Sequence, residues 1–283
     1  MSRTETIRAG DLHFTAEVAG RHGDPLVLLL HGFPQTRHSW RNQLAPLAAA
    51  GYFAVAPDQR GYSAGARPDT IAAYAAGLLV ADALAMADTL GYEQLHLVGH
   101  DWGGQLSWLL AAYHGERLAS LSVLSRPHPA AFAASMADDP QQAERSKHHR
   151  AFLDPGTADL LLADGAARLR TTLAAQGVPE ADIDAYLSVL GERPALDAAL
   201  NWHRAAADRG TALAAADVPA VDVPTLYLWG DADATVGAAA ARGTARYVTA
   251  DYRFEVLPDV GHFITDQASD RVNELLLDFL GNG

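Results

Sequence analysis

The segment formed by residues 99–104, Gly-His-Asp-Trp-Gly-Gly, constrains the fold of this chain more than any other feature. A short apolar run, residues 95–98, precedes it, and apolar residues at helical spacing follow it. We therefore expect a buried strand, a sharp turn and a helix, with Asp101 at the turn. Such a turn strains the backbone of the residue it presents, so small residues are needed two positions before and after it. Gly99 and Gly103 meet that need.

An aspartate at this turn narrows the possible chemistry. A serine there attacks acyl carbons, whereas a carboxylate suits attack on an alkyl carbon and gives an ester within the enzyme. The structural alternative is that Asp101 only caps the following helix, as aspartates after strands often do. Other parts of the chain favour Asp101 as a nucleophile.

Composition excludes several function classes. The net charge of −13 argues against a nucleic acid or an anionic membrane surface as partner. The chain has no cysteine, which removes disulfides, thiol catalysis and Cys-ligated metal sites. We find neither an apolar stretch of signal-peptide length nor a run of the roughly 20 apolar residues that span a membrane. We expect a cytoplasmic protein, and its oligomeric state does not follow from the sequence.

Strand and helix patterns alternate along most of the chain, which implies a mostly parallel sheet flanked by helices. We expect a hairpin at 7–20, a continuous apolar strand at 25–30, and further strands at 52–56, 95–98, 118–124, 225–229 and 252–257. Helical patterns cover 36–50, 71–90, the stretch after Asp101, and 266–280. Residues 128–213 contain no convincing strand and are rich in Ala and Leu. We predict that they form a helical cap, inserted into a core made of 1–127 and 214–283.

Two further strand ends carry candidate catalytic groups. In open parallel sheets, catalytic groups gather beyond the carboxyl ends of strands. Asp233 follows the run at 225–229, and His262 follows the run at 252–257. The order Asp101, Asp233, His262 is the nucleophile, acid and base order of α/β-hydrolases. His262 would activate water and Asp233 would orient it; Asp231 is a rival for the acid, and we favour Asp233.

The loop after the run at 25–30 reads His-Gly-Phe-Pro, residues 31–34. An oxyanion hole needs two backbone N–H groups near the nucleophile. Phe33 precedes a proline, which restricts it to an extended conformation and can fix the direction of its N–H. Trp102, directly after Asp101, supplies the second donor. We expect these two N–H groups to form the oxyanion hole.

Four motifs together resemble the α/β-hydrolase epoxide hydrolases. They are residues 31–34 (HGFP), 58–63 (DQRGYS), 99–104 (GHDWGG) and 261–263 (GHF). The resemblance covers nearly the whole chain and implies an α/β-hydrolase fold with an inserted helical cap. It also implies hydrolysis of an epoxide through a covalent ester on Asp101, with water as co-substrate. We expect no cofactor.

The cap departs from the family pattern at two positions. Epoxide hydrolases usually carry two cap tyrosines, which hold and protonate the epoxide oxygen. One precedes an aromatic residue and a Pro-Gly turn, and the other lies in an Asn-Trp-Tyr-Arg motif. The residues here are His148 and His203, which the resemblance places in the tyrosines' role. A histidine, with a pKa near 6.5, is only partly cationic at neutral pH, whereas a tyrosine stays protonated.

The remaining cap residues indicate an apolar ligand. The Ala and Leu residues of the cap and Trp202 suggest a mainly apolar small-molecule substrate, and no basic cluster marks a carboxylate site. We expect His149 to be an exposed helical residue. A metal site is not expected, because His148 and His149 would point about 100° apart on a helix without a third ligand in register.

Three other interpretations stay open. Haloalkane and fluoroacetate dehalogenases share the Asp nucleophile; a histidine like His148 belongs to the fluoride site of the latter, and the Trp102 indole could help hold a halide. Phe33 stands where haloalkane dehalogenases have Asn or Glu, and Trp102 and Gln105 stand where fluoroacetate dehalogenases place arginines. A non-catalytic ligand-binding protein or an unusual biosynthetic enzyme could use the same fold. Epoxide hydrolysis is the function that we favour.

Overall fold

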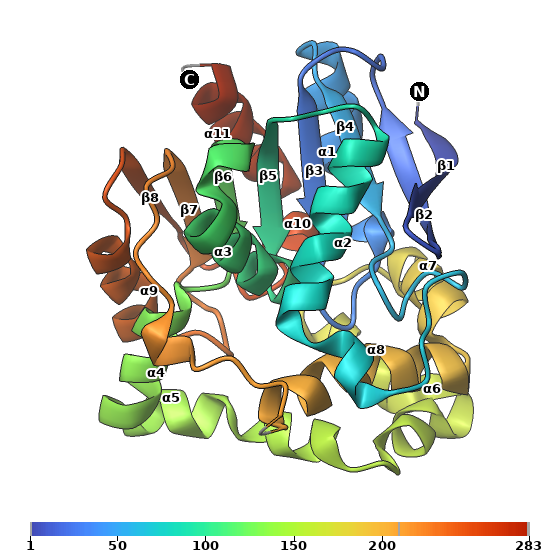
Figure 1. Ribbon diagram of the computed structural model, residues 1–283. Helices are drawn as coiled ribbons and strands as arrows, with labels where there is room; N and C mark the ends of the chain where they lie inside the picture. Colours follow the sequence, from blue (N-terminus) through green and yellow to red (C-terminus); the bar gives the residue numbers. More distant parts are fainter. Residues whose placement is uncertain (1, 209, 282–283) are drawn as a thin grey trace.

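An eight-stranded sheet forms the centre of the molecule (Figure 1). The computed structural model describes residues 2–208 and 210–281. The strands are β1 (Arg3–Ala9), β2 (Leu12–Ala19), β3 (Leu26–Leu30), β4 (Phe53–Pro57), β5 (Leu95–His100), β6 (Leu118–Leu124), β7 (Thr225–Gly230) and β8 (Tyr252–Leu257). Their order in the sheet is β1-β2-β4-β3-β5-β6-β7-β8. Strand β2 is antiparallel to both of its neighbours, β1 and β4, and the other neighbouring strands pair in parallel, so the predicted mostly parallel sheet is confirmed.

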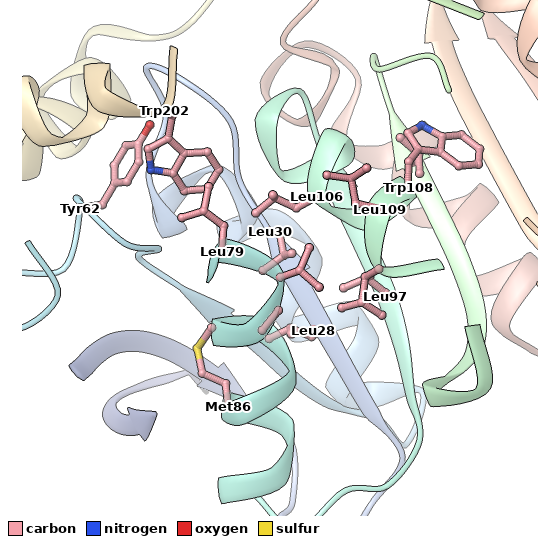
Figure 2. Packing of buried hydrophobic residues seen from close by; sticks show 14 of the residues in the cluster. Leu28, Leu30, Tyr62, Leu79, Met86, Leu97, Leu106, Trp108, Leu109 and Trp202 are labelled. Carbon is pink, nitrogen blue, oxygen red and sulfur yellow. The ribbon is translucent and has the colours of Figure 1, made fainter. Parts of the chain in front are cut away.

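Helices cover both faces of the sheet, which explains why the central strands read as continuous apolar runs. All five residues of β3 are buried, and they alternate between two apolar clusters. Leu28 and Leu30 face α2 (Ala76–Thr89) and α3 (Trp102–His114), as Figure 2 shows. Val27 and Leu29 belong to the opposite cluster, with α1 (Arg41–Ala49) and α11 (Ser269–Gly281). The two-residue period of a strand therefore supplies both layers of the core.

Several short helices connect the strands and the longer helices of the core. They are the 3-10 turns η1 (Arg37–Trp40), η2 (Ile71–Tyr74), η3 (Gly115–Arg117), η5 (Ala215–Asp217) and η6 (Thr244–Tyr247), with α9 (Ala238–Gly243) and α10 (Ile264–Gln267). The predicted helix at 266–280 is in fact two helices, α10 and α11, broken at Ala268. The hairpin also begins earlier than predicted, at Arg3. Helix α9 was not predicted, because six residues are too few to show a helical period.

Between β6 and β7 the chain leaves the sheet and forms a helical layer across one end of it (Figure 1). The elements are α4 (Pro129–Asp138), α5 (Pro140–Arg145), the 3-10 helix η4 (Lys147–Leu153), α6 (Thr157–Ala175), α7 (Glu180–Leu190) and α8 (Arg193–Ala207). Helix α6 contains a non-helical break at residues 163–166. We call this layer the cap and keep its boundaries, 128 and 213, as a proposal. Residues 1, 209, 282 and 283 of the proposed ranges lie outside the described residues.

Two of the cap's attachments to the core position α8 and α7. At one, the indole N–H of Trp202 in α8 donates to the carbonyl of Arg60 over 2.8 Å, and Trp202 lies beside Tyr62 (Figure 2). At the other, α7 meets α1 and α10. There Asp182 of α7 pairs with Arg41, which also pairs with Asp266 of α10.

Apolar contacts reinforce the second attachment. Ile183 and Tyr186 of α7 pack with Phe263, the residue next to His262. The Tyr186 hydroxyl also lies 3.0 Å from the Asp266 carboxylate. We call these contacts between α7, α1 and α10 the clasp.

Candidate active site

Asp101 lies on a strained turn between β5 and α3. Its φ is 50° and its ψ is −114°, a conformation that non-glycine residues rarely adopt. The predicted need for glycine on either side is met: a Cβ at Gly99 would collide with Ser107 Oγ, and one at Gly103 would collide with the carbonyl of Leu30. A Cβ at Gly32 would collide with Asp101 itself. Because these three glycines have no side chain, the surrounding backbone can pack closely and present the Asp101 carboxylate at the carboxyl edge of the sheet.

The structure brings the three predicted catalytic side chains together. His262 Nε2 lies 3.5 Å from Asp101 Oδ2, and His262 Nδ1 lies 2.8 Å from Asp233 Oδ2. The rival Asp231 is exposed and accepts the backbone N–H of Asp259 instead. Asp233 is thus the carboxylate in contact with His262.

The Asp233 carboxylate is held in place by several hydrogen bonds. Its Oδ1 accepts the Thr235 N–H at 2.7 Å, the Thr235 hydroxyl at 2.6 Å and the Val236 N–H at 3.0 Å. This leaves Oδ2 for His262, so Nδ1 carries a proton and Nε2 faces Asp101. Thr235 was not predicted from the sequence, although it lies two residues after Asp233, a common place for the partner in a side-chain–backbone turn.

Electrostatics in this group favour a charge-separated resting state. Burial lowers the pKa of His262, but the carboxylates of Asp233 and Asp101 outweigh burial and raise it above its ordinary value. Burial raises the pKa of Asp101, but His262 outweighs burial and lowers it below its usual range. An imidazolium between two carboxylates follows, with Asp101 ionised as a nucleophile must be.

The Phe33 N–H donates to Asp101 Oδ1 over 3.0 Å. This is the bond expected of one arm of an oxyanion hole. Within the described residues, the Trp102 N–H, the first of α3, makes no hydrogen bond to the carboxylate. Its part in an oxyanion hole therefore stays a prediction.

A cavity of about 370 Å³ separates the cap from these groups. The core lines it with Phe33, Pro34, Asp101, Trp102, Arg126, Ala234, Thr235, Val236, His262 and Phe263. The cap lines it with Phe132, Arg145, His148, His149, Phe152, Leu161, Leu169, Thr172, Gln176 and His203. Apolar and aromatic walls with a few converging polar groups are typical of small-molecule sites.

His203 lies among aromatic rings above the nucleophile. Its Nε2 accepts the indole N–H of Trp102 at 3.1 Å, so Nδ1 carries the proton in the neutral ring. The ring centroids of Phe33 and Phe152 lie 5.2 Å and 4.7 Å from that of His203. Burial holds the pKa of His203 well below its ordinary value, so the ring is neutral at pH 7. The expectation from the sequence that this histidine is partly cationic is therefore wrong.

His148 and His149 lie side by side on η4, with ring centroids 4.3 Å apart. His148 Nδ1 lies 2.8 Å from the carbonyl of Arg145, so Nδ1 donates and Nε2 is left for another partner. Burial lowers the pKa of His148, and it lowers that of His149 to about 4. His149 is helical, as predicted, but the prediction that it is exposed is wrong: it is half-buried, because the tighter 3-10 turn brings both side chains to the cavity.

Comparisons with known proteins agree with this architecture. A family model described as alpha/beta hydrolase fold matches residues 25–268. Epoxide hydrolase 3 of Xenopus tropicalis is 33% identical over 280 residues, which cover 95% of this chain and 74% of the relative. Epoxide hydrolase A of Mycobacterium tuberculosis is 30% identical and covers 93% of this chain and 92% of its own.

This chain belongs to the epoxide hydrolase family of the α/β-hydrolase fold. It is a hydrolase, as the family implies. The crystal structure of epoxide hydrolase A from Mycobacterium thermoresistibile superposes with a TM-score of 0.85 at 28% identity, covering 99% of this chain and 98% of that one. Both findings confirm the predicted fold.

Trp202 is a correction to the predicted site. We expected it to bind substrate, but it does not line the cavity, and its indole N–H donates to Arg60 in the core. Its neighbour His203 lines the cavity instead, because successive helical residues point about 100° apart. Trp202 therefore fixes the position of α8 and, through it, of His203.

In residues 2–208 and 210–281, no helix is both long and apolar enough to cross a membrane. The same residues contain no group of three His, Cys, Asp or Glu side chains placed to hold a metal ion.

Proposed function

We propose that this hydrolase opens epoxides to diols through an ester on Asp101. The observation that carries the proposal is the placement of one carboxylate. Asp101 Oδ2 lies near the imidazole of His262, while Oδ1 accepts the Phe33 N–H, in a cavity with largely aromatic walls. A carboxylate with one oxygen in an N–H site and the other beside a base can both attack carbon and be released by water.

In the first half-reaction, Asp101 Oδ2 attacks an epoxide carbon and the carbon–oxygen bond of the ring breaks. The ring oxygen leaves as an alkoxide that must be stabilised and protonated. His203 offers its Nδ1–H as a hydrogen-bond donor, because Trp102 occupies Nε2. His148 is the better proton source, because the Arg145 carbonyl on Nδ1 favours its imidazolium and leaves Nε2–H to be transferred.

Ester formation prepares His262 for the second half-reaction. Once alkylated, Asp101 is neutral, so one of the two carboxylates that raise the pKa of His262 is lost. The imidazolium then releases a proton and becomes a base. The proton it releases balances the one that the alkoxide took up, so the first half-reaction needs no net proton from solvent.

In the second half-reaction, His262 Nε2 takes a proton from water, and the oxygen attacks the Asp101 carboxyl carbon. Negative charge develops on Oδ1, where the N–H groups of Phe33 and Trp102 would stabilise it. Collapse breaks the bond to the alkyl oxygen, which takes the proton from His262. The products are the diol and an Asp101 carboxyl group that contains one oxygen from water; its proton passes to His262, which restores the resting carboxylate and imidazolium.

Dehalogenation is less well supported. The indole N–H of Trp102, a potential halide donor, is occupied by His203. Phe33 contributes only its backbone N–H and an apolar ring to this part of the cavity. A screen of terminal and aryl epoxides against haloalkanes and haloacids, scoring diol against halide, separates the two activities.

Single turnover in oxygen-18 water tests the ester. The heavy oxygen should enter Asp101 first and be found in the peptide that contains it. In His262→Gln, a protein adduct of the mass of the epoxide should accumulate on Asp101. Immediate labelling of the diol, with no label in Asp101, would mean direct attack by water and would overturn the proposal.

A further inference from the structure

Among the described residues of the core wall, Arg126 is the one charged residue that the mechanism does not use. It follows β6, two residues after Leu124, and its side chain lines the cavity. A Cβ placed on Gly104 would lie 2.8 Å from Arg126 Cβ, so this glycine gives the arginine room beside the first turn of α3. The residue is thus packed closely against the nucleophile's helix.

The guanidinium of Arg126 is oriented but not neutralised. Its Nε donates to Gln105 Oε1 over 3.0 Å, and its central carbon lies 4.7 Å from the ring centroid of Phe132. Across residues 2–208 and 210–281, this is its only side-chain hydrogen bond, and no carboxylate lies within 4.0 Å of it. Two Nη groups, which bind carboxylates in pairs, are left without a protein partner.

The position is unfavourable for a cation in the absence of a ligand. Burial lowers the pKa of Arg126, and the N-terminal end of α3, where it lies, carries a partial positive charge. Asp233 offers a distant negative charge but is already paired with His262, and the other distant negative charge is that of Asp101. That charge disappears when Asp101 is alkylated, so it cannot balance Arg126 through the whole cycle.

The other charged groups of the cavity also leave Arg126 without a neutralising partner. Among the described lining residues, the histidines of the cap have lowered pKa values, and Asp101 is the one carboxylate. Arg145 is a second cation, but one of its Nη groups already donates to the carbonyl of Asp233 over 2.7 Å. A purely structural Arg126, packed on Phe132, would not need a charge, since a leucine or methionine would fill the same place without a desolvation cost.

We infer that Arg126 binds a carboxylate of the substrate, so the preferred substrates are epoxides that carry a carboxylate beside an apolar group. The inference rests on the proposed epoxide hydrolysis and names its substrate class. It differs from the sequence-based expectation of a mainly apolar substrate, which rested on the absence of a basic cluster in the sequence. The aromatic wall would receive the apolar part, and Gln105 and Phe132 would hold the guanidinium in place.

A matched pair of substrates tests this assignment. Phenylglycidate carries a carboxylate next to its epoxide, and phenylglycidamide is neutral and of nearly the same shape. We expect kcat/KM for the acid to exceed that for the amide on the order of 10- to 100-fold, the range of one or two charge-assisted hydrogen bonds. Equal values, or a preference for the amide, would overturn the inference.

Three variants separate charge recognition from a structural role. Arg126→Met should lower kcat/KM for the acid by the same 10- to 100-fold and leave the amide within about threefold. Arg126→Lys should restore part of the preference. Arg8→Met, an exposed arginine of β1 outside the cavity, makes the same change in net charge and should leave the preference intact. Equal losses on acid and amide in Arg126→Met would show that the residue only supports the fold.

A binding measurement keeps the test independent of turnover and of the methionine variant's folding. Phenylpropanoate should raise the melting temperature of the wild-type protein more than phenylpropanamide does, with a smaller difference in Arg126→Lys. If the acid binds in this way but neither epoxide is hydrolysed, the proposed function fails and the role of Arg126 stands. If both epoxides are hydrolysed without preference and the acid does not bind better, the role of Arg126 fails and the proposed function stands.

Discussion

The core half and the cap half of the site are built differently. In the core half, Asp101, Asp233 and His262 are connected through specific oxygen and nitrogen atoms, and Asp233 Oδ1 alone accepts three hydrogen bonds. In the cap half, His149 and His203 meet their neighbours mainly through ring contacts. The comparison indicates that the core fixes the geometry of the reaction, whereas the cap can change residues without rebuilding it.

The backbone explains the contrast. The core residues follow strands whose positions are set by the hydrogen bonds of the sheet, so each side chain starts from a fixed point. The cap residues lie on a short 3-10 helix and a long helix, near a helix that is itself broken at residues 163–166. Substitutions in the core half should therefore have larger effects on catalysis than those in the cap half.

The largest effect should come from the nucleophile. Asp101→Asn should lower turnover by at least about 10⁴-fold, because the amide cannot form the ester. Diol formation under saturating substrate measures the loss, and circular dichroism checks that the protein is folded. Mass spectrometry checks that the introduced amide has not been hydrolysed back to the acid. Turnover close to the wild-type value in such protein would show that Asp101 is not the nucleophile.

A smaller but still large loss should follow when the acid is changed. Asp233→Asn should lower turnover on the order of 10³-fold, because His262 loses the carboxylate that orients it and stabilises its charge. The matched control is Asp231→Asn, two residues away, which removes an exposed carboxylate that contacts only a turn. Equal losses in the two variants would mean that the contact between Asp233 and His262 does not set the rate.

Changes in the cap should alter pH dependence more than activity. Since burial lowers the pKa of His148, its acid form declines as pH rises through a value below 6.5, and the alkylation rate should fall with it. Hydrolysis of the ester should rise with pH as His262 loses its proton, so turnover is bell-shaped. Stopped-flow measurement from pH 5 to 9 resolves the two limbs.

Tyrosines at both cap positions sharpen this prediction. His148→Tyr with His203→Tyr should flatten the alkylation limb up to high pH, because a tyrosine keeps its proton, and raise alkylation on the order of tenfold at pH 8. His148→Ala with His203→Ala is the control for the loss of both rings. If the tyrosine pair is inactive while the alanine pair retains activity, the cap histidines do not have the tyrosines' role.

The smallest effect should come from Thr235. Thr235→Val removes the hydroxyl bond to Asp233 but keeps the backbone N–H bond, so turnover should fall about three- to tenfold. Thr235→Ser should restore most of it. A loss as large as that of Asp233→Asn would show that the hydroxyl, which also lies 2.7 Å from His262 Nδ1, acts on the base directly.

Sequence patterns predicted the core better than the cap for a physical reason. The strands at 118–124 and 252–257 match their predicted bounds, because each is rich in strand-forming residues and lies between turns, although β8 is only half-buried at the edge of the sheet. The strand ends then place Asp233 and His262 near Asp101. His149, Arg126 and Trp202 could not be assigned this way, since their directions depend on a 3-10 turn, on a gap left by Gly104 and on the rotation of α8.

The clasp has a consequence for how molecules enter and leave. It ties α7 to α10, which begins two residues after His262, through the pairing of Arg41 with Asp182 and Asp266. The opposite end of the cap is tied to the core as well, because the Gln142 amide of α5 bonds the backbone of Thr235 and Gly237, and Arg145 bonds the carbonyl of Asp233. Both ends of the cap are thus joined to the segments that carry the acid and the base. A movement of the whole cap away from the core would therefore displace the catalytic groups, so substrates and products should pass while both ties stay closed.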